Sequence, residues 1–252
     1  MLWHKSWLDT RWRFLIGFCV LVVMAGGIII DYSVSATLLP AIAERQMDTS
    51  TMTGRLLQEM IRIEQTYRGF VWYQWFRGNL LTAGTLLSVL LGSGGVISTS
   101  TGGLFTLSLP ASRTQWLATR AATGLGEVFV LATLPSVAIP VLSPLIGQHY
   151  SLVDVAAQGL CMFVAAAVFY SLAFLLSTVF NDIWRPLLIA IGLACVIGYA
   201  EVFFGLDGVF KIMGGRRYFE SGSLPWIGLT SSAAVSMALL YGAAANVARK
   251  DF

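Results

Sequence analysis

The sequence predicts an all-α, polytopic membrane protein whose chain crosses the bilayer six times. Of its 252 residues, 56% are hydrophobic and only 12% are charged, whereas a soluble domain carries roughly a quarter charged residues. The apolar residues come in long uncharged runs, and a run of about 18 or more residues with few charges indicates a transmembrane segment. A lipid-facing backbone must satisfy its own hydrogen bonds, which such runs do as helices.

Six segments are long enough to cross a hydrocarbon core of about 30 Å, since each residue of a helix rises about 1.5 Å. We expect these helices at residues 14–38, 78–98, 124–146, 153–180, 185–205 and 225–247. Pro135, Pro140 and Pro144 predict that the third helix is bent or broken towards its outer end.

The basic residues favour an arrangement with both termini in the cytoplasm. With the N-terminus inside, eight lysine and arginine residues fall on each side of the bilayer, but most of the outer ones belong to one long loop. The positive-inside bias concerns residues close to the spans. Six crossings also return the chain to the side where it began, so we expect a cytoplasmic C-terminus as well.

Residues 1–13 have the pattern of an amphipathic helix. Trp3 and Trp7 fall on one side at helical spacing, while Lys5 and Arg13 fall on the other. The pattern predicts an elbow helix that lies along the inner leaflet. The plainer alternative is a simple anchor flank, since tryptophan is common at the headgroup level in any membrane protein.

Two loops on the outer side are long. Residues 40–77 exceed the usual length of a loop without secondary structure, and apolar residues recur there at helical spacing, so we expect helices. This segment is either an aromatic interface belt packed on the bundle or part of a substrate gate or docking surface. The second loop, residues 206–224, precedes the sixth helix.

The loop between the second and third helices, residues 99–120, carries the most local information. Ser112 and Gln115 have the spacing of a capping box, so a new helix should begin near Arg113 and continue into the third span. Upstream, a short apolar stretch ends at Pro110, as a separate short helix would. An uncharged helix exposed at the inner surface needs a cover, and a partner protein is a natural candidate.

The segment from Gly103 to Arg113 reads G-L-F-T-L-S-L-P-A-S-R. It resembles the cytoplasmic loop of the permease subunits of type-2 ATP-binding-cassette (ABC) exporters, which often reads Gly-Thr-Leu, some leucines, then Leu-Pro-Val-Ser-Arg. The tryptophan-rich start of the chain and its Arg-Lys-Asp-Phe ending are also similar to this family. The resemblance implies a single permease domain over residues 1–252 that forms the translocation pathway in the bacterial cytoplasmic (inner) membrane.

The resemblance also implies partners and a coupling site. The permease would work with two copies of a cytoplasmic ABC ATPase subunit, which bind the ATP, and with a second permease copy or homologue in the bilayer, without nucleic acid. Residues 101–109 would form a coupling helix that docks on the ATPase. The residues that it implies for ATPase coupling are Leu104, Phe105, Leu107, Ser112 and Arg113.

The chain is not expected to be an enzyme. A phosphate-binding loop needs a glycine-rich turn that ends in Gly-Lys-Ser/Thr, and none of its three lysines has that setting. The two histidines, His4 and His149, lie outside or at the edge of the predicted spans, which argues against an intramembrane enzyme. The alternative function is a secondary transporter, or another polytopic membrane protein without an ATPase partner. Secondary transporters commonly contain internal repeats, and we find none.

Glu127 lies about two turns into the third predicted helix, on one stripe with Arg113 and Arg120 at seven-residue spacing. A carboxylate within a span is a functional candidate by default. Two interpretations stay open: Glu127 meets a basic group or the headgroup region near the inner interface, or it is a polar station on a transport pathway. We expect ordinary interfacial roles for three acids near predicted helix ends, Asp31, Asp154 and Glu201.

Overall fold

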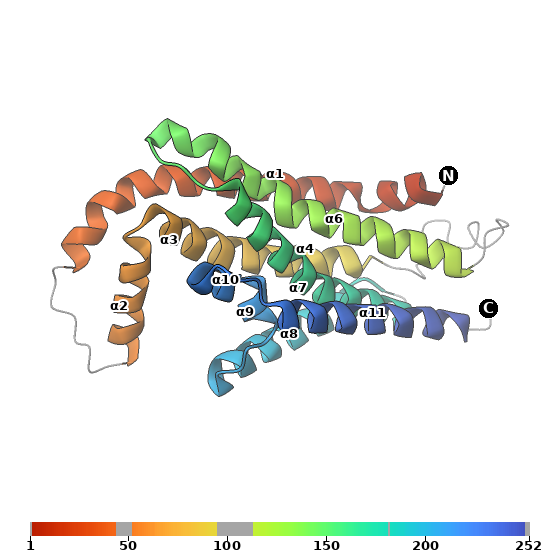
Figure 1. The fold of residues 1–252 in the computed structure, drawn as a ribbon. Coiled ribbons are helices and arrows are strands. Elements are labelled where there is room, and N and C mark those ends of the chain that lie inside the picture. Colours follow the sequence, from red (N-terminus) through yellow and green to blue (C-terminus); the bar gives the residue numbers. More distant parts are fainter. Residues whose placement is uncertain (1, 44–51, 95–112, 181, 250–252) are drawn as a thin grey trace.

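The computed structural model describes residues 2–43, 52–94, 113–180 and 182–249 (Figure 1). Every regular element within these ranges is a helix, which confirms the all-α prediction. Five helices are long and apolar enough to cross a membrane. They are α1 (Leu2–Ala43), α6 (Arg113–Leu142), α7 (Leu152–Val179), α8 (Trp184–Phe204) and α11 (Trp226–Ala248).

The second predicted span differs from the other five. It corresponds to α4 (Leu80–Gly92), whose 13 residues rise only about 20 Å, less than the hydrocarbon core. However, α4 continues without a gap from a π-helix, η1 (Trp72–Asn79), and from α3 (Tyr67–Val71). The three elements form one long helical run. The hydrogen-bond register changes within it at η1, where the π-helix separates α3 from α4.

Helix α7 forms the centre of the bundle, because α4, α6, α8 and α11 all pack on it. Small residues allow the close approach: a side chain at Gly92 of α4 would overlap the Tyr170 carbonyl of α7. Ser171 of α7 and Ser236 of α11 share a buried hydrogen bond of 2.7 Å. By contrast, α8 leaves large apolar side chains exposed, including Val196, Tyr199 and Val202, as a lipid-facing helix does.

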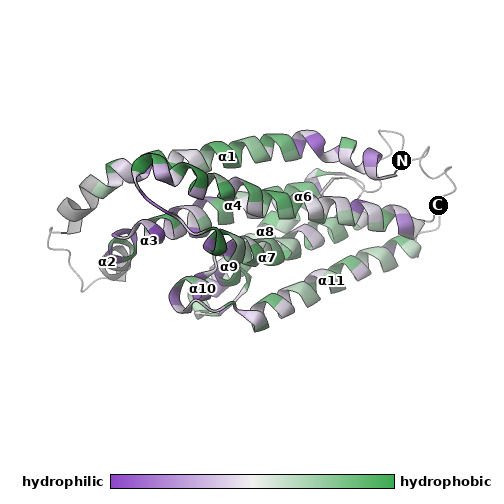
Figure 2. Ribbon diagram, turned by 45° about the horizontal axis from the view of Figure 1, so that its top comes forward, coloured by the Kyte–Doolittle hydropathy of each residue, from purple (hydrophilic) through white to green (hydrophobic). Residues whose placement is uncertain are grey.

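Short helices cover one end of the bundle. They are α2 (Met52–Glu64), α3, α9 (Val209–Met213) and α10 (Arg216–Ser221), and hydrophilic residues gather in α2 and α10 (Figure 2). The helical prediction for the 40–77 loop is therefore confirmed where the structure describes it, and the 206–224 loop also holds two short helices. Thr66 separates α2 from α3, because its hydroxyl accepts from the Gly69 N–H at 3.1 Å and caps the new helix.

Two expectations about helix ends differ from the structure. Residues 2–13 are helical but continue into the first span as one helix, α1, so a separate elbow helix is not confirmed. Helix α6 runs through Pro135 and Pro140 and gives way to a 3₁₀ turn, η3 (Ser143–Ile146). The predicted change at the outer end of the third helix therefore occurs at Pro144, after the two earlier prolines.

Candidate functional site

Of the five residues predicted for ATPase coupling, the structure describes only Arg113. Leu104, Phe105, Leu107 and Ser112 lie outside the described residues. Arg113 is the first described residue after this gap and is helical, within α6, so the start of the helix predicted near Arg113 stays a prediction.

Glu127 lies inside the bundle between α1 and α6. Its side chain is 4% exposed, and its Oε1 accepts a hydrogen bond from the Thr10 hydroxyl. Its other oxygen, Oε2, has no hydrogen-bond partner within the described part of the chain. Among the described residues no basic group forms an ion pair with Glu127, although the charge of Arg120 lies near enough to act on its carboxylate. Both interpretations of Glu127 therefore stay predictions. A second polar group with an unpartnered buried atom is Gln158 of α7, at its Nε2.

Arg120 lies seven residues before Glu127 on the same stripe of α6, but its ion pair and its hydrogen bond are with other residues. Its Nη1 lies 3.5 Å from the Asp9 carboxylate of α1, and its Nη2 donates to the Gly94 carbonyl just beyond α4. Arg13 of α1 donates to the Leu90 carbonyl of α4 at 3.4 Å. These contacts hold the start of α1, the end of α4 and the start of α6 together, at the end of the bundle where both termini lie (Figure 1).

Tyr170 completes this cluster from α7. Its hydroxyl donates to the Arg120 carbonyl at 3.4 Å, and the side chain is fully enclosed. Gly124 of α6 makes room for the ring, because a Cβ atom there would overlap the phenol. Nothing in the sequence pattern predicted this contact, since it joins residues on two helices that are far apart along the chain.

At the opposite end, Asp154 joins three elements. From the first turn of α7, it binds Arg68 of α3 at 2.9 Å and accepts from the Tyr218 hydroxyl of α10, also at 2.9 Å. Burial, followed by the neighbouring Asp154 carboxylate, raises the pKa of Tyr218 above its ordinary value, so the phenol stays a donor at neutral pH. The interfacial role expected for Asp154 is too simple, because the carboxylate ties α3 and α10 to α7.

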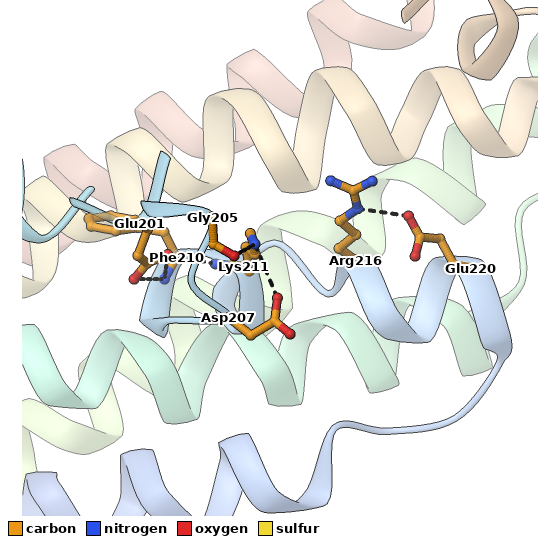
Figure 3. Close-up of polar contacts among 7 residues, drawn as sticks. All are labelled: Glu201, Gly205, Asp207, Phe210, Lys211, Arg216 and Glu220. Carbon is orange, nitrogen blue, oxygen red and sulfur yellow. Dashed lines mark hydrogen bonds and ion pairs between the residues drawn. The ribbon is translucent and has the colours of Figure 1, made fainter. Parts of the chain in front are cut away.

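Glu201 near the end of α8 has a comparable role (Figure 3). Both carboxylate oxygens accept from the Phe210 N–H at 3.1 Å, and Oε2 also accepts from the Lys211 N–H at 3.3 Å. The side chain is 5% exposed, so it caps the first turn of α9 from inside the protein. Gly208 permits this approach, since a Cβ atom there would overlap the carboxylate. The interfacial role expected for Glu201 stays a prediction, and the structure adds that the carboxylate caps α9.

The π-helix η1 supplies the aromatic core of this end. Trp72 stacks on Phe219 of α10, with ring centroids 4.3 Å apart and planes within 7°. Its indole N–H donates to the Gly214 carbonyl at 2.8 Å, and Trp75 donates to Ser136 of α6, also at 2.8 Å. π-helical turns are rare and occur frequently at functional sites, which marks this region as a second candidate site.

Comparison with protein-family models, curated proteins and solved structures gave no match to this chain. The two candidate sites therefore rest on their own geometry: a buried polar cluster around Glu127 at the end with the termini, and an aromatic and charged cap at the other end.

Proposed function

We propose that the chain is the membrane-spanning permease subunit of an ABC exporter, which forms the translocation pathway and couples to a separate cytoplasmic ATPase. One observation carries the proposal: the two termini, the end of α4 and the start of α6 all lie at one end of the bundle (Figure 1). The connection that resembles a coupling loop thus leaves and re-enters the bundle at that end, next to both termini. An ATPase bound there would contact a single face.

The position of the termini also supports six crossings. Five crossings would leave the two termini at opposite ends, whereas N and C lie at the same end (Figure 1). The continuous run from Tyr67 to Gly92 supplies a sixth crossing, with α4 in the hydrocarbon core and η1 at its outer boundary. The partly buried hydrogen bonds from Arg13 to the Leu90 carbonyl and from Arg120 to the Gly94 carbonyl would then stiffen the inner end against which the ATPase acts.

The proposal includes a location, an orientation and partners. The permease resides in a bacterial cytoplasmic membrane with both termini in the cytoplasm, and it assembles with a second permease copy or homologue and two ATPase subunits. Residues 2–13 act as the elbow at the inner surface, although they are continuous with α1. Glu127 is a polar station of the pathway, because its buried Oε2 has no described partner.

The experiment is purification of the tagged full chain from its native membranes, followed by measurement of vanadate-sensitive ATP hydrolysis. We expect a P-loop ATPase subunit to co-purify, and combined alanine substitution of Leu104, Phe105 and Leu107 to remove it, since an aromatic anchor such as Phe105 can carry much of the energy of an interface. The matched control replaces three apolar residues at the other end, Leu145, Leu152 and Val153, which are 81%, 63% and 70% exposed. It should leave the complex intact.

Orientation is tested in intact cells by cysteine labelling from outside. A Met47→Cys probe should react and a Lys250→Cys probe should not. Absence of any ATPase subunit from wild-type preparations, together with transport that follows an ion gradient, would instead favour the secondary transporter.

A further inference from the structure

A cavity of about 420 Å³ is lined by residues of α2, η1 and α10. Helices α2 and α10 lie at the end of the bundle away from the termini (Figure 1). The volume of the cavity lies within the range of small-molecule sites, about 300–1,000 Å³. Three arginines from three different elements line it: Arg62 of α2, Arg77 of η1 and Arg216 of α10. One acid, Glu220, lines it as well.

The positive charge of this cavity is only partly neutralised. The Arg216 Nε binds the Glu220 Oε1 at 2.7 Å (Figure 3). Arg62 is exposed and has no hydrogen bond or ion pair with any residue that the structure describes. The Arg77 guanidinium lies 5.8 Å from the Trp72 ring and 5.0 Å from the Tyr73 ring, and rings do not cancel its charge. Since arginine stays protonated in proteins, the described residues that line the cavity carry a formal net charge of two positive units.

One wall of the cavity is apolar and rigid. Ile63, Trp72 and Phe219 form it. The two aromatic rings stack at 4.3 Å, and the Trp72 indole is fixed by its hydrogen bond to the Gly214 carbonyl. Phe219 is half-buried, so part of its surface is available to a ligand. A site with fixed aromatic surface and convergent charges is built for a ligand that has both an anionic and an apolar part.

We propose that this cavity binds the phosphate monoester group of an amphipathic molecule. The phosphate contacts the guanidinium groups of Arg62 and Arg77, and the adjoining apolar part lies against Phe219. A phosphate monoester carries about −1.5 to −2 charges near neutral pH, which offsets the net charge of the cavity. Planar guanidinium groups bind phosphate oxygens in bidentate fashion. The proposal does not depend on a transport role. The phosphate has two possible sources, a phosphatidic acid headgroup or a soluble ester.

The test uses the full chain in phosphatidylcholine nanodiscs, with phenyl phosphate as the soluble probe in isothermal titration calorimetry. A second arm adds phosphatidic acid to the nanodisc and measures lipid retained on the protein by native mass spectrometry. The Arg62→Gln, Arg77→Gln double variant should weaken binding by about tenfold or more, because charge-assisted hydrogen bonds are lost. Arg217→Gln, on the same helix as Arg216 but outside the cavity, should leave binding unchanged.

Glu220→Gln should change binding in the opposite direction. It removes the only acid among the described residues that line the cavity, so binding should tighten severalfold. Binding of phenyl phosphate supports the proposal with a soluble source, and selective retention of phosphatidic acid alone supports it with a lipid source. Equal binding by wild type and the double variant, or binding of neither probe, overturns it. If the double variant does not run as a single species in gel filtration, the two single variants test the proposal instead. Arg62→Gln should weaken binding of the probe and Glu220→Gln should tighten it, and equal binding by both overturns the proposal.

Discussion

Replacement of Glu201 by alanine should destabilise α9 and loosen the cap of short helices at the end of the bundle away from the termini. The carboxylate accepts from the N–H groups of Phe210 and Lys211 at 3.1 and 3.3 Å. These groups belong to the first turn of α9, where backbone donors have no partner within the helix. A hydrogen bond to a charged group contributes about 1.5–3 kcal/mol, and loss of a cap costs about 0.5–2 kcal/mol.

Because the Glu201 side chain is only 5% exposed, water replaces it poorly, and we expect Glu201→Ala to cost about 2–3 kcal/mol. Glu201→Gln keeps one carbonyl oxygen as an acceptor but loses the charge, so it should cost about 1 kcal/mol. The matched control is Asp207→Ala. The Asp207 side chain is 93% exposed and binds the Lys211 ammonium at 3.1 Å, and such surface pairs contribute little.

The measurements are thermal unfolding in detergent and amide hydrogen exchange over residues 209–213. Exchange should be slowest in wild type and Asp207→Ala, faster in Glu201→Gln and fastest in Glu201→Ala. Exchange in Glu201→Ala that equals that of wild type would refute the capping role. Equal effects of the alanine and glutamine variants would show that the acceptor oxygens are not what stabilises α9.

Three further predictions concern the rest of the bundle. Thr10→Val should lower stability by about 1–3 kcal/mol in thermal unfolding, because it removes the described donor to the buried Glu127 carboxylate. Gly92→Ala should cost about 1–3 kcal/mol through overpacking against α7, while Gly192→Ala, which meets open space, should be near neutral in the same assay. Burial raises the pKa of Glu64, so the folded state favours its protonated form. Protection of the α2 amides, measured relative to their intrinsic exchange rate at each pH, should therefore increase as the pH falls from 7 towards 5, and Glu64→Gln should abolish this increase.

The lengths of the apolar runs were enough to predict five of the spans from sequence. Helices α7, α8 and α11 begin and end within a few residues of expectation, and α6 ends within a few residues of it. Helix α6 is already helical at Arg113, eleven residues before the start expected for that span. The first span was harder to delimit. Residues 1–13 and the run after them both favour helix, so nothing local decides whether the helix breaks between them, and packing of Thr10 against α6 keeps it continuous.

The contacts within the candidate sites could not be predicted from the sequence, because they join residues far apart in the chain. Thr10 lies 117 positions from Glu127, and Arg68 lies 86 positions from Asp154. Periodicity reports which face of a helix is apolar, but not which helix it meets. The π-helix at 72–79 was also missed. Its aromatic residues suggested an interface belt, and the change in hydrogen-bond register has no single-residue signal. An acid near a helix end was the available clue to Glu201.

The centre of the bundle and the cap of short helices are held together by interactions of different strength. At the centre, α7 is enclosed by four helices and buries large side chains such as Phe169, Tyr170 and Phe174. The cap at the end away from the termini is held by the Arg68–Asp154 pair, in which the Arg68 side chain is 47% exposed, by ring stacking and by a few hydrogen bonds. An exposed ion pair contributes about 0–1 kcal/mol and an aromatic pair about 0.5–1.5 kcal/mol. The free energy of local opening depends on the total of the interactions that opening breaks. The cap should therefore open while the spans stay packed. A ligand in the arginine cavity joins α2, η1 and α10, and its binding would therefore stabilise the closed cap.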